Sequence, residues 1–335
     1  MMSPLSARAR RLGIAAPLVG VLLLAACAPS ASSPAAGSST AACGQKDHYT
    51  IGVAQWDLRE PYRKQAQVDF KRLVQQYPKF SLLERDAQGK VDQQVSDVDA
   101  LLTQKADLII LYPGDSAGLS AEVKKVHDAG VPLLEIDRST PDASQFVAQL
   151  GGDNKEIAKE QADYLAQNLP DGAKVAVITG DLSSDAATER RDGALEGLKA
   201  HPGIKVVAQQ TANWRSNEAQ AVVSAIIQND PDLAGIIYAN DEESLGGWQA
   251  LKDAGKEGQV KSVGIDGLRG PANGIQEVVD NKLLATYVYP NGVAEALKAA
   301  DGLLVSCVAV EPRQIIPTKR VDSSNSAAML AEGDS

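Results

Sequence analysis

The chain has 335 residues with a formal net charge of −10, and its apolar content is sufficient for one large or two medium domains. Residues 1–26 contain three arginines and no acidic residue, so the rest of the chain has a net charge near −13. An acidic surface argues against nucleic acid and anionic lipid as partners. Only three histidines are present, without a paired metal-binding spacing, so we expect no metal site and no cofactor.

The N-terminal segment has the pattern of an export signal. A basic stretch at residues 8–11 precedes an apolar run at residues 12–26, and the tetrapeptide Leu-Ala-Ala-Cys ending at Cys27 resembles a bacterial lipobox. We therefore predict a lipoprotein signal peptide over residues 1–26 and lipidation of Cys27. Residues 27–47, rich in Ala, Ser, Gly and Pro, are predicted to be a disordered tether, so that the lipid is the only membrane contact.

From residue 49 onward, short β-branched runs alternate with helical patterns. The expected strands are residues 49–55, 80–84, 108–112, 132–136, 146–150, 174–179, 204–209, 235–238, 261–265 and 285–289. The expected helices include residues 62–77, 91–104, 119–129, 157–168, 187–200, 217–228 and 242–254. Repeated strand–helix–strand units predict parallel sheets with helices on both faces.

Ten strands would make an unusually long single open sheet, so we predict an α/β fold of two Rossmann-like lobes joined by a hinge of several segments. The N-terminal lobe is expected over residues 48–150 and 290–312. The C-terminal lobe is expected over residues 151–289 and 313–325. Two such lobes bind ligands between the carboxyl ends of their strands.

Polar and aromatic residues recur at these strand ends in both halves of the chain. The candidates are Gln55, Trp56, Tyr62, Arg63, Tyr112, Asp137, Arg138, Arg190, Trp214, Asn240, Asp266 and Tyr289. Carboxylates accept hydroxyl protons, guanidinium groups donate hydrogen bonds, and flat rings can cover the C–H face of a polyol. Each residue alone could equally be a turn or packing residue. Their recurrence favours a small, neutral, polyhydroxylated ligand.

Several of these motifs follow the order found in a known family. Ile51-Gly52-Val53-Ala54-Gln55, Pro61-Tyr62-Arg63, Asp137-Arg138, Asn240-Asp241 and Gly264-Ile265-Asp266-Gly267 resemble periplasmic sugar-binding proteins of the ribose and galactofuranose type. The resemblance spans roughly residues 49–321. It implies the type I periplasmic binding protein fold and a monomeric, extracytoplasmic receptor, not an enzyme, that delivers a small sugar or polyol to an ABC permease.

The resemblance also implies roles for individual residues. Tyr62 and Trp214 would stack on the sugar, and Tyr289 would complete the wall beside the hinge. The hydrogen-bonding residues would be Arg63, Asp137, Arg138, Arg190, Asn240 and Asp266. Tyr289 stands where many ribose receptors carry an amide, and Tyr112 where they often carry a small residue or an amide, which argues against ribose itself. The Tyr62-Arg63 pair is closer to the galactofuranose branch.

The two remaining cysteines, Cys43 and Cys307, are a candidate disulfide. In the family's fold the first strand and the helix at residues 293–306 belong to one lobe, and exported proteins retain disulfides. The alternative is two unpaired thiols.

Other functions remain to be weighed against the receptor. Gly114-Asp115-Ser116-Ala117-Gly118 matches the nucleophile motif of serine hydrolases, but only His127 and His201 follow it, both too early in the chain for that class. We therefore expect Ser116 to have no role. A receptor that signals to a membrane sensor remains a full alternative to one that feeds a permease. The identity of the ligand also stays open.

Overall fold

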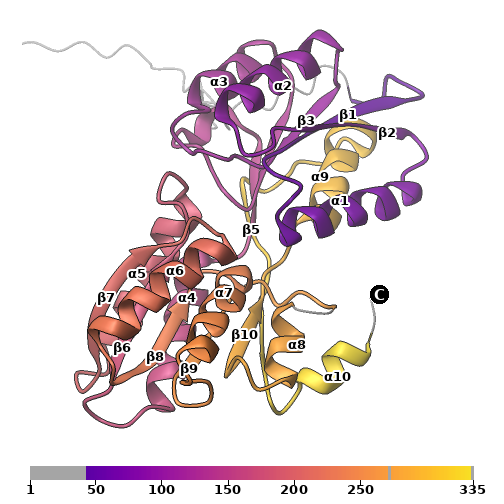
Figure 1. Cartoon of the computed structure of the whole chain (residues 1–335). Helices are drawn as coiled ribbons and strands as arrows, with labels where there is room; N and C mark the ends of the chain where they lie inside the picture. The colour runs from indigo at the N-terminus through magenta and orange to yellow at the C-terminus, as the bar shows by residue number, and fades with distance from the viewer. Residues whose placement is uncertain (1–42, 271–272, 333–335) are drawn as a thin grey trace, which may run out of the picture. The chain divides into compact units, whose positions relative to one another are not determined.

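The computed structural model describes residues 43–270 and 273–332. Cys27, the expected signal peptide and most of the expected tether lie outside these ranges. Across the described part of the chain, strands and helices alternate as expected and form two α/β lobes (Figure 1). No helix within the described ranges has the length and apolar character needed to cross a membrane.

The first sheet has six parallel strands in the order β11-β5-β4-β3-β1-β2. Its strands are β1 (Tyr49–Gln55), β2 (Phe80–Asp86), β3 (Leu108–Leu111), β4 (Leu133–Ile136), β5 (Ala148–Gly151) and β11 (Arg313–Ile315). Helices α1 (Pro61–Leu73) and α9 (Val293–Asp301) pack on one face, and α2 (Val91–Thr103) and α3 (Ser120–Asp128) on the other. The central strands β3 and β4 are buried on both sides, which explains their largely apolar sequences.

The second sheet repeats this arrangement in the order β12-β10-β9-β8-β6-β7. Its strands are β6 (Lys174–Thr179), β7 (Lys205–Thr211), β8 (Leu233–Tyr238), β9 (Lys261–Val263), β10 (Ala285–Val288) and β12 (Lys319–Asp322). Helices α4 (Asn154–Gln167) and α5 (Asp185–Lys199) cover one face, and α6 (Ser216–Asn229) and α7 (Asp241–Asp253) cover the other. Helices α8 (Gly274–Val279) and α10 (Ser326–Ala331) pack near β12, the one antiparallel strand of this sheet.

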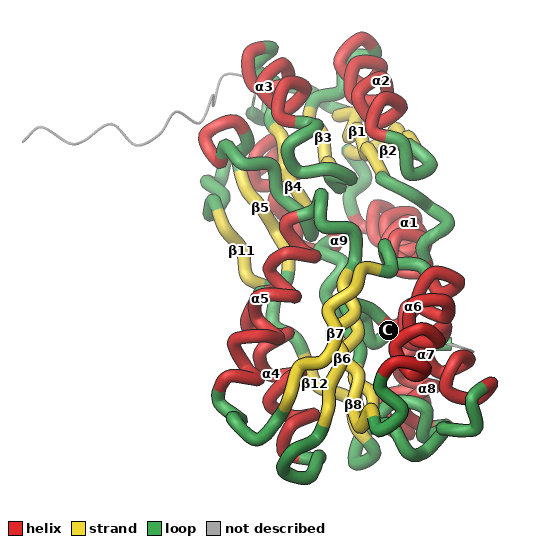
Figure 2. Tube along the Cα trace, turned by 60° about the vertical axis from the view of Figure 1, so that its left-hand side comes forward, coloured by secondary structure: helices red, strands yellow, loops and turns green. Residues whose placement is uncertain are grey.

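The chain passes between the lobes three times, after β5, after β10 and after β11 (Figures 1 and 2). The crossing segments are hydrogen-bonded to one another. The Ile316 N–H donates to the Gly151 carbonyl at 2.9 Å, and the Thr318 hydroxyl donates to the Val288 carbonyl. A hinge of several linked segments restricts the motion of the lobes mainly to opening and closing.

The third crossing lies later than the sequence predicted. We expected the C-terminal lobe to resume at residue 313, but β11 pairs with β5 of the first sheet, with Arg313 beside Gln149. This boundary was wrong because β11 is a short, largely exposed edge strand without a clear apolar pattern.

The end of the expected tether is also corrected. Cys43 forms a disulfide with Cys307, with 5.6 Å between their Cα atoms, as the resemblance implied. Next to it, the Gly44 N–H donates to the Leu304 carbonyl at 2.8 Å, and the Lys46 ammonium pairs with Asp107. Residues 43–47 are therefore attached to the first lobe and are not part of a free spacer.

Two helices begin before their apolar patterns do, because polar side chains cap them. The Asp153 carboxylate accepts the Glu156 N–H at the start of α4, and the Ser184 hydroxyl accepts the Ala187 N–H at the start of α5. Such caps extend a helix into polar sequence. The Ser184 cap thus places the first turn of α5 at the edge of the second lobe that faces the first lobe.

Candidate functional site

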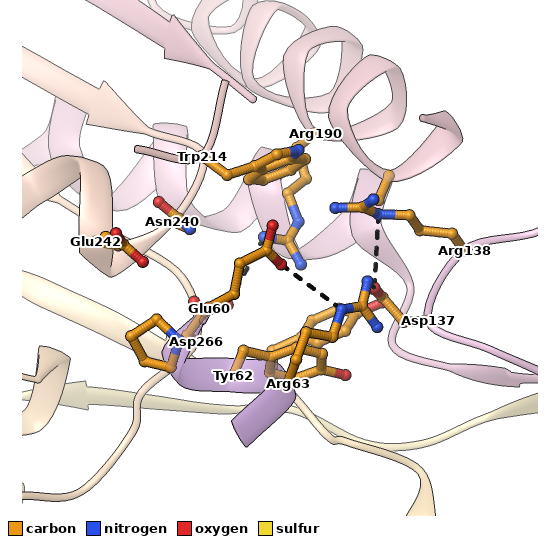
Figure 3. A pocket seen from close by; sticks show the side chains of 13 residues that line it. Glu60, Tyr62, Arg63, Asp137, Arg138, Arg190, Trp214, Asn240, Glu242 and Asp266 are labelled. Atoms are coloured by element: carbon orange, nitrogen blue, oxygen red, sulfur yellow. Dashed lines mark hydrogen bonds and ion pairs between the residues drawn. The ribbon is translucent and has the colours of Figure 1, made fainter. Parts of the chain in front are cut away.

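A cavity lies between the two lobes, at the carboxyl ends of their strands. Its volume is about 30 Å³, counted as the space that the centre of a water-sized sphere can reach. Nine of the twelve residues predicted from the sequence line it, namely Tyr62, Arg63, Asp137, Arg138, Arg190, Trp214, Asn240, Asp266 and Tyr289 (Figure 3).

The first lobe supplies a buried cluster of two guanidinium groups around one carboxylate. The Arg63 Nη2 atom lies 2.7 Å from the Asp137 Oδ2 atom, and the Arg138 Nε atom lies 3.7 Å from the same oxygen. Burial raises the pKa of Asp137, but the charges of Arg63, Arg138 and Arg190 outweigh it and leave the pKa below its ordinary value. Asp137 is therefore ionised, and both arginines hold fixed positions.

The second lobe fixes Arg190 in a similar way. Its Nε atom donates to the Asn154 Oδ1 atom at 2.8 Å, and its Nη1 atom donates to the Ala239 carbonyl at 2.7 Å. The same Nη1 atom lies 3.9 Å from Asp266 Oδ1. Burial raises the pKa of Asp266 well above its ordinary value. The positive charge of Arg190 acts against this shift, and the negative charge of Asp241 adds to it.

Aromatic rings form two walls of the cavity. Tyr62 and Tyr289 meet edge to face, with 5.7 Å between their ring centroids. Trp214 lies against Gly180, where an added Cβ atom would stand 2.1 Å from the indole ring. The sequence thus places a glycine where only a glycine lets this ring approach the backbone.

Three residues of the cavity have unusual backbone conformations. Asp137, Trp214 and Asp266 have φ angles of 68°, 66° and 133°, in a region that costs a residue with a side chain roughly 1–3 kcal/mol. Glu243 holds one of them, because its Oε1 atom accepts the Trp214 N–H at 2.9 Å and its Oε2 atom accepts the Ala239 N–H at 3.2 Å. The surrounding structure thus imposes these conformations at the cavity.

Several buried donors at the cavity have no hydrogen-bond partner among the described residues. They are Arg63 Nε and Nη1, Arg138 Nε and Trp214 Nε1. A buried donor without a partner costs roughly 1–3 kcal/mol. Buried donors of this kind call for acceptors that the described residues do not supply.

Three of the predicted residues do not line the cavity. The Tyr112 ring supports Arg63, whose guanidinium carbon lies 4.9 Å from the ring centroid, and its hydroxyl donates to the Asn291 carbonyl at 2.9 Å. Trp56 packs on Gly114. Gln55 is fully buried at the end of β1, and its amide atoms have no hydrogen-bond partner among the described residues.

Two acidic residues line the cavity without having been assigned to it. Glu60 stands just before α1, and Glu242 lies in the first turn of α7. Both are close in sequence to assigned residues, Tyr62 and Asn240. Asn240 is in addition the cap of α7, since its Oδ1 atom accepts the Glu243 N–H at 2.9 Å. Pro61 and Ala186 complete the lining.

Ser116, the candidate nucleophile, lies at the contact between the lobes. Its hydroxyl is 3.3 Å from Asp185 Oδ1 and accepts the Asp185 N–H at 3.1 Å. The expectation that Ser116 has no role did not take this contact between the lobes into account. His127 and His201 contact their own acidic partners, Asp128 and Asp163.

Further contacts join the lobes around the cavity. The Ser139 N–H donates to Asp185 Oδ2 at 2.8 Å, the Ser116 N–H donates to the Ser183 carbonyl at 3.2 Å, and Arg215 Nη2 lies 3.3 Å from Asp57 Oδ2. The structure is therefore a conformation in which the two lobes touch.

Comparison with known proteins extends these observations. Residues 51–304 match the model of the periplasmic binding protein domain. The chain is 29% identical to the ribose import binding protein of Bacillus subtilis, over 85% of this chain and 90% of that protein. It is also 29% identical to the xylitol-binding protein of Mycolicibacterium smegmatis, over 88% of this chain and 85% of the relative.

A solved structure shows the same architecture. The fructose-binding periplasmic domain of a hybrid two-component system is 28% identical and has a TM-score of 0.82, over 85% of this chain and 94% of that one. The fold and the family inferred from the sequence motifs are thus both confirmed. The chain belongs to the periplasmic binding protein family.

Proposed function

We propose that the protein is an extracytoplasmic receptor that closes around a small sugar or polyol and delivers it to an ABC permease. The unpartnered donors of Arg63, Arg138 and Trp214 at the cavity support this proposal most directly. Hydroxyl oxygens of a sugar accept from these donors, and its hydroxyl protons are accepted by Asp137, Asp266 and Asn240. The ribose- and xylitol-binding relatives agree with this class of ligand.

The mechanism proposed is closure without chemistry. Arg63, Asp137 and Arg138 belong to one lobe, whereas Arg190, Trp214 and Asp266 belong to the other. A ligand that contacts both sets favours the closed conformation, because a ligand shifts an equilibrium only through differential contacts. The aromatic walls cover its C–H faces and exclude water.

The proposal is tested by a thermal-shift screen of the purified domain against neutral sugars and polyols, followed by calorimetry. A true ligand at one hundred times its Kd adds about 2.7 kcal/mol of stability. A D137A/D266A double variant serves as the site control and should show no shift. If no member of the screen stabilises the wild type more than the double variant, the receptor proposal fails.

The anchoring to the membrane is part of this proposal. The lipobox-like tetrapeptide before Cys27 supports a lipidated N-terminus. Cys27→Ser should move the protein from the membrane fraction to the soluble fraction or block its processing. A wild-type protein that fractionates as soluble, with a mature N-terminus elsewhere, would contradict the anchor.

A sensing role is the second candidate, supported by the similarity to a fructose-binding domain of a two-component system. Both roles use the same cavity and the same closure. They differ in the partner, which is a permease in one case and a membrane sensor in the other. Sugar uptake by a deletion strain separates them, because loss of uptake identifies the transport role.

A further inference from the structure

We propose that Glu243 is a positioning residue of the receptor site, because it holds the backbone of Trp214 in the conformation that places the indole ring in the cavity. Trp214 lines the cavity, whereas Glu243 does not. The inference rests on the proposed receptor function, since it concerns the same site. It goes beyond that function by assigning a role to a buried side chain outside the cavity lining.

The loop that carries Trp214 connects β7 to α6 and has a strained backbone. Asn213 and Trp214 follow each other with φ angles of 51° and 66°. A residue with a side chain adopts this left-handed region at a cost of roughly 1–3 kcal/mol, so the surrounding structure must impose the conformation. Within the loop, the Arg215 N–H donates to the Ala212 carbonyl at 2.8 Å. The Trp214 N–H instead points to α7.

Glu243 accepts this N–H from the first turn of α7. It is fully buried, and its Oε1 atom lies 2.9 Å from the Trp214 nitrogen. The Glu243 backbone is itself fixed, because its N–H donates to the Asn240 Oδ1 atom at 2.9 Å in the cap of α7. A well-anchored helix end thus supplies the acceptor that the strained loop needs.

The second oxygen of Glu243 makes a weaker contribution. Its Oε2 atom accepts the Ala239 N–H at 3.2 Å, but the same N–H also donates to the Ile178 carbonyl at 3.0 Å. Ala239 therefore keeps a backbone acceptor without Glu243. Because a buried N–H that loses its acceptor costs roughly 1–3 kcal/mol, removal of the Glu243 carboxyl group would act mainly on Trp214.

The contact depends on an acceptor oxygen and not on a negative charge. Burial raises the pKa of Glu243 to about 8, although the N–H groups of Trp214 and Ala239 act against the shift. A carboxyl group accepts hydrogen bonds in both protonation states. A neutral side chain with an oxygen in the same place should therefore hold Trp214 as glutamate does.

The position of the indole ring matters to both lobes. The guanidinium carbons of Arg138, from the first lobe, and Arg190, from the second, lie 5.3 Å and 5.5 Å from the ring centroid. The ring also packs on Gly180, and Figure 3 shows it beside Arg190 in the cavity. A shifted ring would change its contact with a ligand and with the arginine of the opposite lobe. Glu243 thus acts on affinity through Trp214.

The test compares E243L with E243Q. Leucine is close to glutamate in size but offers no acceptor. Glutamine keeps an oxygen for the Trp214 N–H and can turn its amide toward Ala239, which retains the Ile178 carbonyl. E277Q is the matched control, because Glu277 is also a buried acidic residue of the second lobe but lies outside the cavity lining and bonds to Ser244.

The first measurement needs no ligand. The substitutions W56F and W248F leave Trp214 as the only tryptophan of the chain, and acrylamide then quenches its emission. Because Trp214 is only 6% exposed, the quenching constant reports how often its loop opens. The second measurement is calorimetry with D-galactose, L-arabinose and myo-inositol, which gives Kd for each in the wild-type and W214A backgrounds.

We expect E243L to raise the quenching constant of Trp214 about two- to fivefold, since loss of one hydrogen bond opens the loop more often. E243Q and E277Q should quench as the parent protein does. Affinity for the sugars that bind should fall about three- to tenfold in E243L and stay unchanged in E243Q. In the W214A background E243L should cost no further affinity, because the ring that transmits the effect is absent.

Quenching in folded E243L equal to that of the parent protein would overturn the inference. So would unchanged sugar affinity in E243L, or an affinity loss of the same size with and without the Trp214 side chain. A merely structural role of Glu243 would lower the free energy of unfolding without moving either measurement. If E243L does not fold, E243D decides in its place, because it withdraws the oxygens from the Trp214 N–H by one methylene group.

The two measurements separate this inference from the receptor proposal. Failure of every neutral sugar and polyol to bind the wild type would refute the proposed function, whereas the quenching constants would still decide whether Glu243 holds Trp214. Sugar binding that is equally strong in the wild type and E243L would refute only the role of Glu243.

Discussion

Asp137 is the residue on which the charged groups of the first lobe converge. It is buried, holds Arg63 at 2.7 Å and stands 3.7 Å from Arg138. Its backbone has a φ angle of 68°, so the side chain is directed at the cavity by a conformation that the fold must impose. Because Asp137 is buried between two guanidinium groups, loss of its negative charge would leave Arg63 without its buried partner.

We expect Asp137→Ala to weaken binding of the neutral ligand by about 2–5 kcal/mol, because Arg63 would lose its buried partner. Calorimetry measures the loss, and circular dichroism checks that the variant folds. Asp128→Ala, at an exposed position, is the matched control and should bind as the wild type does. Unchanged affinity in a folded D137A protein would contradict the role of Asp137.

A second residue-scale prediction concerns pH and the buried carboxyl group of Glu277. Burial raises its pKa to about 8, although the Ser244 hydroxyl donates to its Oε2 atom at 2.6 Å. The folded protein therefore holds a proton that the unfolded chain releases near its ordinary pKa. The contribution of Glu277 to the free energy of unfolding is therefore present at low pH and is lost as pH rises from about 4.5 to 8.

We accordingly expect the free energy of unfolding of the Glu277→Gln variant to fall less steeply with pH, between about pH 4.5 and 8, than that of the wild type. The largest slope that one proton can contribute is about 1.4 kcal/mol per pH unit. Urea unfolding between pH 5 and 8 measures the slope, and Glu257→Gln, at an exposed position, should leave it unchanged. A slope in E277Q equal to that of the wild type would show that Glu277 does not titrate in this window.

At the scale of elements, the loop before α3 and the start of α5 form a contact between the lobes. Asp185 accepts from the Ser116 hydroxyl and the Ser139 N–H, at 3.3 Å and 2.8 Å. None of these three residues lines the cavity. They can therefore stabilise the closed conformation without touching the ligand.

We expect Ser116→Ala to weaken ligand affinity by about three- to tenfold, the effect of one typical hydrogen bond, mainly through faster dissociation. Stopped-flow tryptophan fluorescence measures the rate. Ser96→Ala, whose hydroxyl bonds only to the Asp92 carbonyl on α2, is the control. A dissociation rate in S116A equal to that of the wild type would exclude this contact as a determinant of closure.

At the scale of the whole molecule, the disulfide between Cys43 and Cys307 closes a loop of 264 residues in sequence. That loop contains nearly all of both lobes. Because cross-linking restricts the unfolded chain, the disulfide can add up to about 5 kcal/mol in the chain-entropy model.

Reduction or Cys43→Ser should therefore lower the midpoint of urea unfolding while leaving ligand affinity unchanged, since the disulfide is remote from the cavity lining. Thiol labelling of the unfolded, unreduced protein should find neither Cys43 nor Cys307 free. Two labelled thiols, or equal midpoints with and without reductant, would contradict the prediction.

The sequence by itself determined the class of this protein. Apolar residues recur with the period of a strand or of a helix because the local backbone geometry sets that period. The α/β repeats from β1 to β10 could therefore be located within a few residues. The positions just after the strands could also be recognised, because parallel strands place their carboxyl ends at one edge. These two facts led to nine residues of the cavity, and the resemblance of the ordered motifs led to the family.

Only the tertiary structure decided which strand-end residues meet. Tyr112 and Gln55 follow or end strands just as Asp137 does, yet they are buried outside the cavity lining, whereas Glu60 and Glu242 belong to it. The pairing of β11 with β5 and the hydrogen bond from Gly44 to Leu304 were likewise invisible in the sequence, although Cys43 and Cys307 had been a candidate disulfide. Side-chain direction and edge pairing depend on contacts distant in the chain, which local patterns do not encode.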